Sequence, residues 1–456
     1  MSSSLLIRNG QVADSTTPAA PGDLLLEGGR IAARGPCGSL PPPAGCREID
    51  AEGLFVFPGL IDTHAHYLQE SIEGYNMLIE AGVTTALDAC ISMPQAEAAI
   101  ARHPIGLNTL FLFGIWPGRN VNTDNPGTDE LRAAMRAGLA KGAFGIKIIG
   151  GHAPFTPEAT ARAIAVAHEL RIPITIHAGT TNNPDNLNGC LEICDLAADN
   201  PLHLAHINCY CDGRVLTGEP MREAADALAA LQRHPAIVSE SNLGSHGWIG
   251  AALSPDGIPA SRALRDTLAA MGYPPNRNGI EAALADSAVV TCGPVDGRYR
   301  ILPRDEGLRH FRETPSGGSI GLPERNMGVA AALASAKSPD GTFTITALAT
   351  DAGILPRNHL LDRGLALVEA DILSLPEYLH KVCAAPAAML GLDHCKGTLT
   401  PGMDADVILV DPTRRVARTV ISGGQVVYDG GTYFAAPNRL LGLPVQEDER
   451  PAWVRG

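Results

Sequence analysis

Two histidines close a short apolar segment near the start of the chain and are the first candidates for chemistry. The segment 60–66 follows a Pro-Gly break and ends in His64 and His66, with Asp62 two residues before the first histidine. If residues 60–66 form a strand, side chains two positions apart point to the same face. One metal ion could then bind both imidazole nitrogens. A bare His-x-His pair also arises by chance on surfaces, so the interpretation needs support from other segments.

Four further residues with ligand or base chemistry stand inside or at the end of later apolar segments: Lys147, His177, His206 and Asp351. Each alone has a structural explanation. A histidine at a strand end is often a hydrogen-bonded core residue, an aspartate is often a helix cap, and a lysine can extend its charge out of apolar surroundings. Together with the first pair they supply four histidines, a lysine and a carboxylate. We therefore predict a metal site.

The elements that must position these residues alternate between short apolar strands and helical patterns, which is typical of βα units with a parallel sheet. The predicted strands cover residues 60–66, 83–90, 106–115, 144–149, 172–177, 202–207, 236–241 and 344–351. The clearest helical patterns cover residues 130–139, 157–170 and 221–232. Eight repeats predict an α/β fold, a closed (β/α)₈ TIM barrel. Its chemistry would lie at the carboxyl ends of the strands, where the candidate residues stand.

The two ends of the chain show β patterns with glycine turns instead. We predict that residues 1–57 and 395–456 together form a small β-sandwich domain, and that residues 58–394 form the barrel domain. The connection 242–343 is too long for an ordinary βα loop, so we expect a lid-like insertion over the site.

Composition limits the classes of function. The chain has 456 residues, more than one compact core usually holds. A net charge of −14 without a basic block argues against nucleic acid as a partner. No run approaches the roughly 20 apolar residues of a membrane span, so no membrane association is expected. The ten scattered cysteines fit free thiols in a reducing cytoplasm, which is the expected location.

With these residues in view, the chain resembles the amidohydrolase superfamily. The resemblance covers residues 5 to about 430, and it is most similar to the binuclear branch with dihydroorotase, hydantoinase, isoaspartyl dipeptidase and D-aminoacylase. The residues that carry it are Pro58-Gly59-Leu60-Ile61-Asp62-Thr63-His64-Ala65-His66, Gly82-Val83-Thr84-Thr85, Lys147, His177, His206, Ala349-Thr350-Asp351 and the tail motif from Gly397 to Val407.

The resemblance implies a ligand set for two divalent metal ions. His64, His66 and Asp351 would hold the more buried ion, and His177 and His206 the second. Lys147 would bridge both ions after carboxylation by CO₂, because a carbamate is an anionic oxygen ligand and a protonated lysine is not. Zinc suits this histidine-rich set best, although manganese, cobalt or iron also fit.

Cys90 is an alternative bridging ligand. In D-aminoacylase-like members a cysteine near this place binds metal, and the bridging lysine is absent. Here the spacing of Cys90 is shifted by one residue and Lys147 is present, so we favour the lysine.

The implied function is hydrolysis of a carbon–nitrogen amide bond other than a peptide bond, in a cyclic amide or an N-acyl amino acid. A hydroxide shared by the two metals would attack the carbonyl, and Asp351 would act as general acid and base. The expected partner is a small-molecule amide substrate, and the family resemblance suggests a homo-oligomer.

Substrate contacts must come from loops. The candidates are His152, Asn208, Glu240 and Arg357, followed by Arg119, Arg298 and Arg325. Arginine can hold a carboxylate through two parallel hydrogen bonds, although many arginines are simply exposed.

Three alternative functions remain. Deamination of a heterocyclic ring is one, but such members lack the bridging lysine and usually carry His-x-x-Glu, whereas Cys209 is the third residue after His206. Esterase or lactonase activity is another, because the same hydroxide attacks esters. A non-catalytic scaffold is the third, but such relatives tend to lose the ligands that this chain keeps.

Overall fold

The computed structural model describes residues 4–69, 71–89, 93–296, 298–314, 318–324 and 326–455. Two residues named above, Cys90 and Arg325, lie outside these ranges. Within them, no helix combines the length and the apolar character that crossing a bilayer requires.

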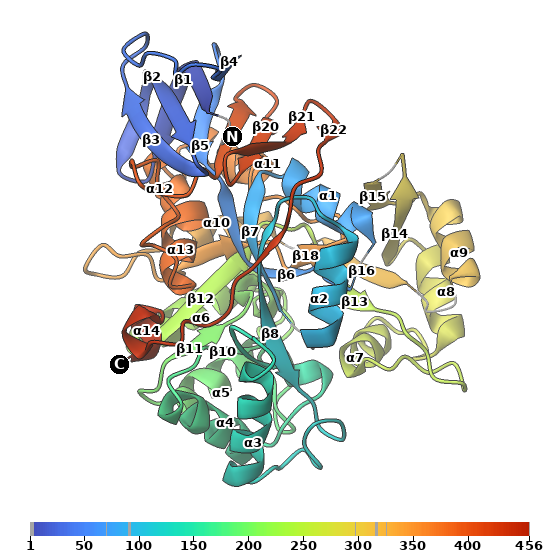
Figure 1. The fold of residues 1–456 in the computed structure, drawn as a ribbon. Helices are drawn as coiled ribbons and strands as arrows, with labels where there is room; N and C mark the ends of the chain where they lie inside the picture. Colours follow the sequence, from blue (N-terminus) through green and yellow to red (C-terminus); the bar gives the residue numbers. More distant parts are fainter. Residues whose placement is uncertain are drawn as a thin grey trace.

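Eight parallel strands form the centre of the molecule and follow one another around the sheet in chain order. They are β6 (Leu60–His66), β7 (Val83–Asp88), β8 (Asn108–Ile115), β9 (Gly145–Ile148), β10 (Ile174–Ile176), β11 (Leu202–Leu204), β12 (Ile237–Asn242) and β17 (Ala347–Ala349). The short β18 (Ala352–Gly353), which directly follows β17, pairs in parallel with β6 and closes the ring. The predicted TIM barrel is confirmed (Figure 1).

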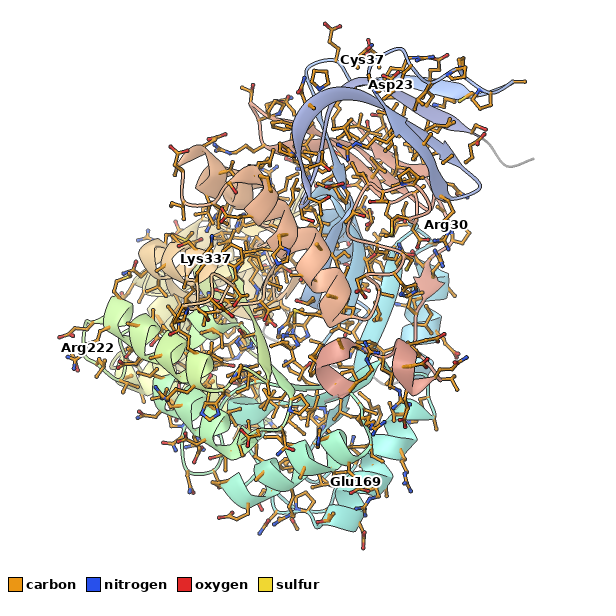
Figure 2. All side chains as sticks on the ribbon, turned by 90° about the vertical axis from the view of Figure 1, so that its left-hand side faces the viewer. Asp23, Arg30, Cys37, Glu169, Arg222 and Lys337 are labelled. Carbon is orange, nitrogen blue, oxygen red and sulfur yellow. The ribbon has the colours of Figure 1, made fainter. Side chains whose placement is uncertain are left out.

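Helices surround the barrel. They are α1 (Ile72–Glu80), α2 (Met93–Arg102), α3 (Thr128–Leu139), α4 (Pro157–Glu169), α5 (Leu187–Ala197), α6 (Pro220–Arg233), α10 (Met327–Ser335), α11 (Asp362–Glu369), α12 (Leu375–Leu379) and α13 (Ala385–Met389). In α4, the side chain of Thr156 caps the first turn, an interaction worth about 1 kcal/mol, and one face with Ala163 and Ala167 is buried. Figure 2 shows Glu169 and Arg222 at the outer surface of these helices.

Both ends of the chain meet in a second, nine-stranded sheet at the top of Figure 1. It contains β1 (Leu5–Asp14), β2 (Thr17–Glu27), β3 (Arg30–Gly35), β4 (Arg47–Asp50), β5 (Phe55–Pro58), β19 (Val407–Asp411), β20 (Val416–Ser422), β21 (Gln425–Asp429) and β22 (Thr432–Tyr433). The antiparallel pair β5 and β19 joins the two ends, and the sheet has an apolar cluster of its own. The last strand, β23 (Arg439–Leu440), returns to pair with β8 of the barrel. The predicted domain boundaries themselves remain a prediction.

The long connection between β12 and β17 folds into a separate unit at the right of Figure 1. Its four-stranded sheet contains β13 (His246–Gly250), β14 (Val290–Val295), β15 (Arg298–Ile301) and β16 (Ser319–Glu324), accompanied by α7 (Arg262–Ala270), α8 (Arg277–Ala285) and α9 (Arg304–Glu313). Buried apolar residues such as Leu264, Ile280 and Phe311 form its core. Because the unit has a packed core of its own, it can hold its side chains in fixed positions beside the barrel. The chain ends with α14 (Ala452–Arg455).

Candidate metal centre

The carboxyl ends of the barrel strands surround a cavity of about 710 Å³. All six predicted metal ligands lie on its wall: His64 and His66 from β6, Lys147 from β9, His177 after β10, His206 after β11, and Asp351 after β17. Parallel strands of a barrel end at the same rim, and this is why ligands far apart in the chain meet.

A first cluster gathers around His64. Its Nε2 atom lies 3.6 Å from Asp351 Oδ1 and 3.4 Å from Lys147 Nζ. The Nε2 atom of His66 lies 3.3 Å from the same carboxylate oxygen. Ligand atoms of His64, His206 and Asp351 all lie within 4.8 Å of one another, so one ion could bind all three.

A second cluster continues from the first through His177. The His177 ring lies 4.6 Å from the ring of His206 and 4.6 Å from that of His152, measured between centroids. Ligand atoms of His152, His177 and Asp185 again lie within 4.8 Å of one another. The His177 Nε2 atom is buried and lies 3.6 Å from Asp185 Oδ2, too far for a normal hydrogen bond. A divalent ion fits such a site, because it would occupy the space between the imidazole and the carboxylate.

The charges of these groups suit metal binding. Burial, together with the charge of Lys147, lowers the pKa of His64 well below its usual value, so the imidazole is neutral. Burial alone raises the pKa of Asp351, but Arg357, whose Nη2 atom lies 2.8 Å from Asp351 Oδ2, helps to hold that pKa well below its usual value. A neutral imidazole and an ionised carboxylate are the forms that bind metal.

The backbone at two of the ligands is in an unusual conformation. His206 has φ 35° and Asp351 has φ 51°, in the left-handed region that side chains other than glycine rarely adopt. Strained residues of this kind persist where the surroundings hold them, and they gather at functional sites.

Asp62 helps to keep the backbone near these ligands in place. This fully buried carboxylate accepts hydrogen bonds from the backbone N–H groups of His64 and Thr350, and from the Thr350 hydroxyl. It thereby ties the first strand of the barrel to the last, next to Asp351. Burial raises the pKa of Asp62 to about 6.

Glu240, a predicted substrate contact, does not line the cavity. It is fully buried behind the histidines, where its Oε1 atom accepts hydrogen bonds from His64 Nδ1 at 2.8 Å and from the backbone N–H of His206 at 2.6 Å. Its other oxygen contacts Nε2 of His203. When His64 donates from Nδ1, its Nε2 is left as the ligand atom, so Glu240 sets the tautomer of a candidate ligand.

Asn208 also lies away from the cavity wall. Its side chain is buried, donates to Asn242 and accepts from Ser241 and from the backbone N–H of Asn242. These bonds hold the turn after β11 against the end of β12. The structure therefore gives Asn208 a supporting position.

The remaining candidates divide between the cavity and other places. His152, Arg119 and Arg357 line the cavity. Arg119 is exposed, and its guanidinium lies 4.8 Å from the ring of Trp116. Arg298 pairs with Glu80 at 2.9 Å and lines a different cavity of about 270 Å³. Cys90, the alternative bridging ligand, lies outside the described residues.

Two residues of the site were missed from the sequence. His203 lies inside β11, and burial lowers its pKa to about 3, so it is neutral beside Glu240. Asp185 lies in the loop after His177. Neither stands at the carboxyl end of a predicted strand, where most of the candidate ligands stand.

Replacing Glu240 with Gln tests its positioning role. We expect zinc to bind about 10-fold to 100-fold more weakly, because a neutral amide oxygen accepts from His64 Nδ1 less strongly than a carboxylate does and favours the Nδ1-protonated tautomer less. Competition with a chelating dye measures this affinity.

Glu223→Gln is the matched control. Glu223 is equally buried, but it accepts backbone N–H groups at residues 213, 215 and 216, away from the cavity. Equal zinc affinity in both variants would contradict the role of Glu240.

Comparisons with known proteins find similar sequences and similar folds. A sequence model of the amidohydrolase family matches residues 328–427. A dihydroorotase of Pelobacter propionicus is 25% identical over 449 residues, which cover 90% of each chain. The structure of N-acyl-D-glutamate deacylase from Bordetella bronchiseptica, with zinc and a phosphonate inhibitor, has a TM-score of 0.66 at 17% identity and covers 96% of this chain and 99% of that one. A D-hydantoinase from Thermus sp. has a TM-score of 0.60 at 17% identity and covers 98% and 100%.

Proposed function

We propose that the chain is a member of the amidohydrolase superfamily and that it hydrolyses a carbon–nitrogen amide bond in a small molecule, with divalent metal ions as cofactors. The observation that carries this proposal is the meeting of all six predicted ligands on the wall of one cavity. The names of the relatives support the same class of reaction, since they include a dihydroorotase and a deacylase.

The residues present fit two divalent ions. His64, His66 and Asp351 would hold the first ion, and the family resemblance assigns His177 and His206 to the second. Two ions held here would provide a Lewis acid for the amide carbonyl and an activated water at neutral pH. Zinc suits the imidazole-rich set.

Lys147 would join the ligand set as a carbamate. Its side chain is 3% exposed, and its Nζ atom faces Nε2 of His64 at 3.4 Å. A protonated amine in that place would repel a metal ion, whereas the carbamate provides anionic oxygens. This supports carboxylation of Lys147 once metal is present.

Asp351 would move the proton. Its carboxylate stays ionised at neutral pH because Arg357 lies beside it, so it can accept a proton from the attacking water. The same carboxylate can then deliver that proton to the leaving nitrogen. Arg357 holds Oδ2, so Oδ1 remains directed to His64 and His66.

The size and lining of the cavity favour an N-acyl amino acid over a small cyclic amide. A volume of about 710 Å³ is in the range that encloses a drug-sized ligand. Trp248, Ile249 and Leu322 of the insertion give it an apolar wall that suits an acyl chain. Arg119 also lines the cavity, has no carboxylate partner among the described residues and can bind the carboxylate of an amino acid.

The proposal also covers the cellular location and the oligomeric state of the protein. The nine cysteines that the structure describes are all free thiols, which supports the reducing cytoplasm as its location. A homo-oligomer remains a prediction from the family resemblance.

A paired substrate panel tests the proposed function. Zinc-loaded protein is assayed with cyclic amides and imides, and with N-acyl amino acids of both configurations. We expect release of a free amino acid. Ring opening without a second product would place the reaction with the cyclic amidases, and no turnover on either group, with metal bound, would contradict the proposal.

A further inference from the structure

We propose that His203, in the middle of β11, is a positioning residue for both metal ions and that it acts on them through Glu240. This inference rests on the two-ion site of the proposed function. It names a residue that belongs neither to the proposed ligand set nor to the cavity wall. His203 is 3% exposed and contacts Glu240, which lies behind the ligand histidines. Loss of this contact should weaken the binding of both ions together.

Glu240 contacts one proposed ligand of each ion through a single oxygen atom. Its Oε1 accepts one hydrogen bond from His64 Nδ1 at 2.8 Å and another from the backbone N–H of His206 at 2.6 Å. His64 is a proposed ligand of the first ion, and His206 of the second. The place of this carboxylate therefore fixes the ring of one ligand and the backbone of the other. That backbone has φ 35° and needs such support to persist.

His203 determines which way the carboxylate of Glu240 faces. Its Nε2 atom contacts Oε2, the oxygen of Glu240 that does not bond to His64 or His206. The last torsion of a glutamate side chain has only weak preferences of its own, so a carboxylate held at one oxygen can turn. Contacts at both oxygens fix its plane. Since Glu240 is fully buried, its charge also needs hydrogen-bond donors in place of water.

Thr175 determines where His203 carries its proton. Burial lowers the pKa of His203 to about 3, so the imidazole is neutral and has a single ring proton. The hydroxyl of Thr175 lies 3.1 Å from Nδ1 and can donate to it, which leaves the proton on Nε2, facing Glu240. Strand pairing brings these side chains together, because Thr175 lies opposite His203 on one side and Lys147 on the other.

The polar character of these buried residues also needs an explanation. The interior of a TIM barrel is usually filled by bulky branched apolar side chains. Here Thr175, His203 and Glu240 form a connected polar chain, each member at most 3% exposed. Buried polar groups cost stability unless every one is satisfied. An apolar residue in place of Glu240 would leave His64 Nδ1 and the backbone N–H of His206 without this acceptor.

Three variants test the proposal through the zinc affinity of each ion, measured by competition with a chelating dye. His203→Leu removes the donor to Glu240, and we expect both ions to bind about 10-fold more weakly. His203→Gln keeps an N–H donor on a side chain of similar reach, so we expect most of the affinity to remain. Thr175→Val removes the hydroxyl that orients His203 and should cause a smaller loss for both ions.

His103→Leu is the matched control. The His103 ring packs 5.1 Å from the ring of Tyr75, away from the cavity wall, so we expect wild-type affinity for both ions. Wild-type affinity in His203→Leu would overturn the proposal. Equal losses in His203→Leu and His203→Gln would also overturn it, because altered packing would then explain the effect without the hydrogen bond. If His203→Leu does not fold, unchanged affinity in Thr175→Val decides against the proposal.

A double-mutant cycle tests whether His203 acts through Glu240. We expect His203→Leu to cause little further loss of zinc affinity once Glu240→Gln is present, since residues in one hydrogen-bonded chain are coupled. Fully additive losses would contradict this route. The visible absorption bands of the cobalt(II)-loaded protein, which report ligand geometry, should shift in His203→Leu and stay in place in His203→Gln. No measurement here uses turnover, so failure of the amide-hydrolysis proposal would be seen separately in the substrate panel.

Discussion

Replacing Asp351 with Asn should lower turnover by about 10²-fold to 10⁴-fold, the usual contribution of a positioned acid or base. The amide keeps the shape of the side chain and one ligand oxygen, so zinc binding should persist at saturating metal. It cannot carry a proton between the attacking water and the leaving nitrogen. The measurement is kcat beside zinc content in the same preparation.

Asp212→Asn is the control for this variant. Asp212 also lines the cavity, but it pairs with Arg214 and has no place in the proposed proton path. We expect kcat to change by less than about 10-fold in this variant. A wild-type rate in Asp351→Asn with metal bound would show that another group moves the proton.

Replacing Lys147 with Ala should lower the metal content below two ions per chain. The lysine is buried among the ligand nitrogens, and no other described side chain can place an anionic oxygen beside His64 from β9. Elemental analysis after gel filtration in metal-free buffer measures the effect, and turnover should fall with the metal content.

Lys381→Ala provides a matched control. Lys381 is as deeply buried, but its ammonium donates to the carbonyl of Ile345 and does not line the cavity. Its loss should reduce stability and leave the metal content unchanged. Two tightly bound ions in Lys147→Ala would instead point to Cys90 as the bridging residue.

The barrel, and the cavity at which the candidate ligands meet, were predictable because both depend on a regular pattern. Short apolar segments separated by amphipathic helices predicted eight strands, and the structure has a strand in each predicted segment. The carboxyl ends of barrel strands meet at one rim, so His177, His206 and Asp351 were candidates from position, and the family resemblance implied their roles as ligands.

For Glu240 and Asn208, position near a strand end did not predict where the side chain lies. Both stand near strand ends, as the ligands do, but position along the chain does not say whether a side chain faces the cavity or the layer behind it. Glu240 faces the buried side of His64, and Asn208 faces the neighbouring strand end. Only the packing of adjacent strands decides between these directions.

Asp185 and the apolar wall of the cavity could not be predicted from the sequence for a different reason. Asp185 lies in a loop, where no periodicity predicts direction, and its approach to His152 depends on two glycines in another loop. The wall residue Trp248 belongs to the insertion, which was expected as a lid without any prediction of which residues it would present.

The most direct test of the account is turnover of N-acyl amino acids by the same protein sample before and after its metal is removed by a chelator and then restored. We expect no measurable hydrolysis by the metal-free protein, and recovery in proportion to added zinc. Hydrolysis that continues at the original rate without metal would contradict the central claim that the residues around His64 form a metal-dependent active site.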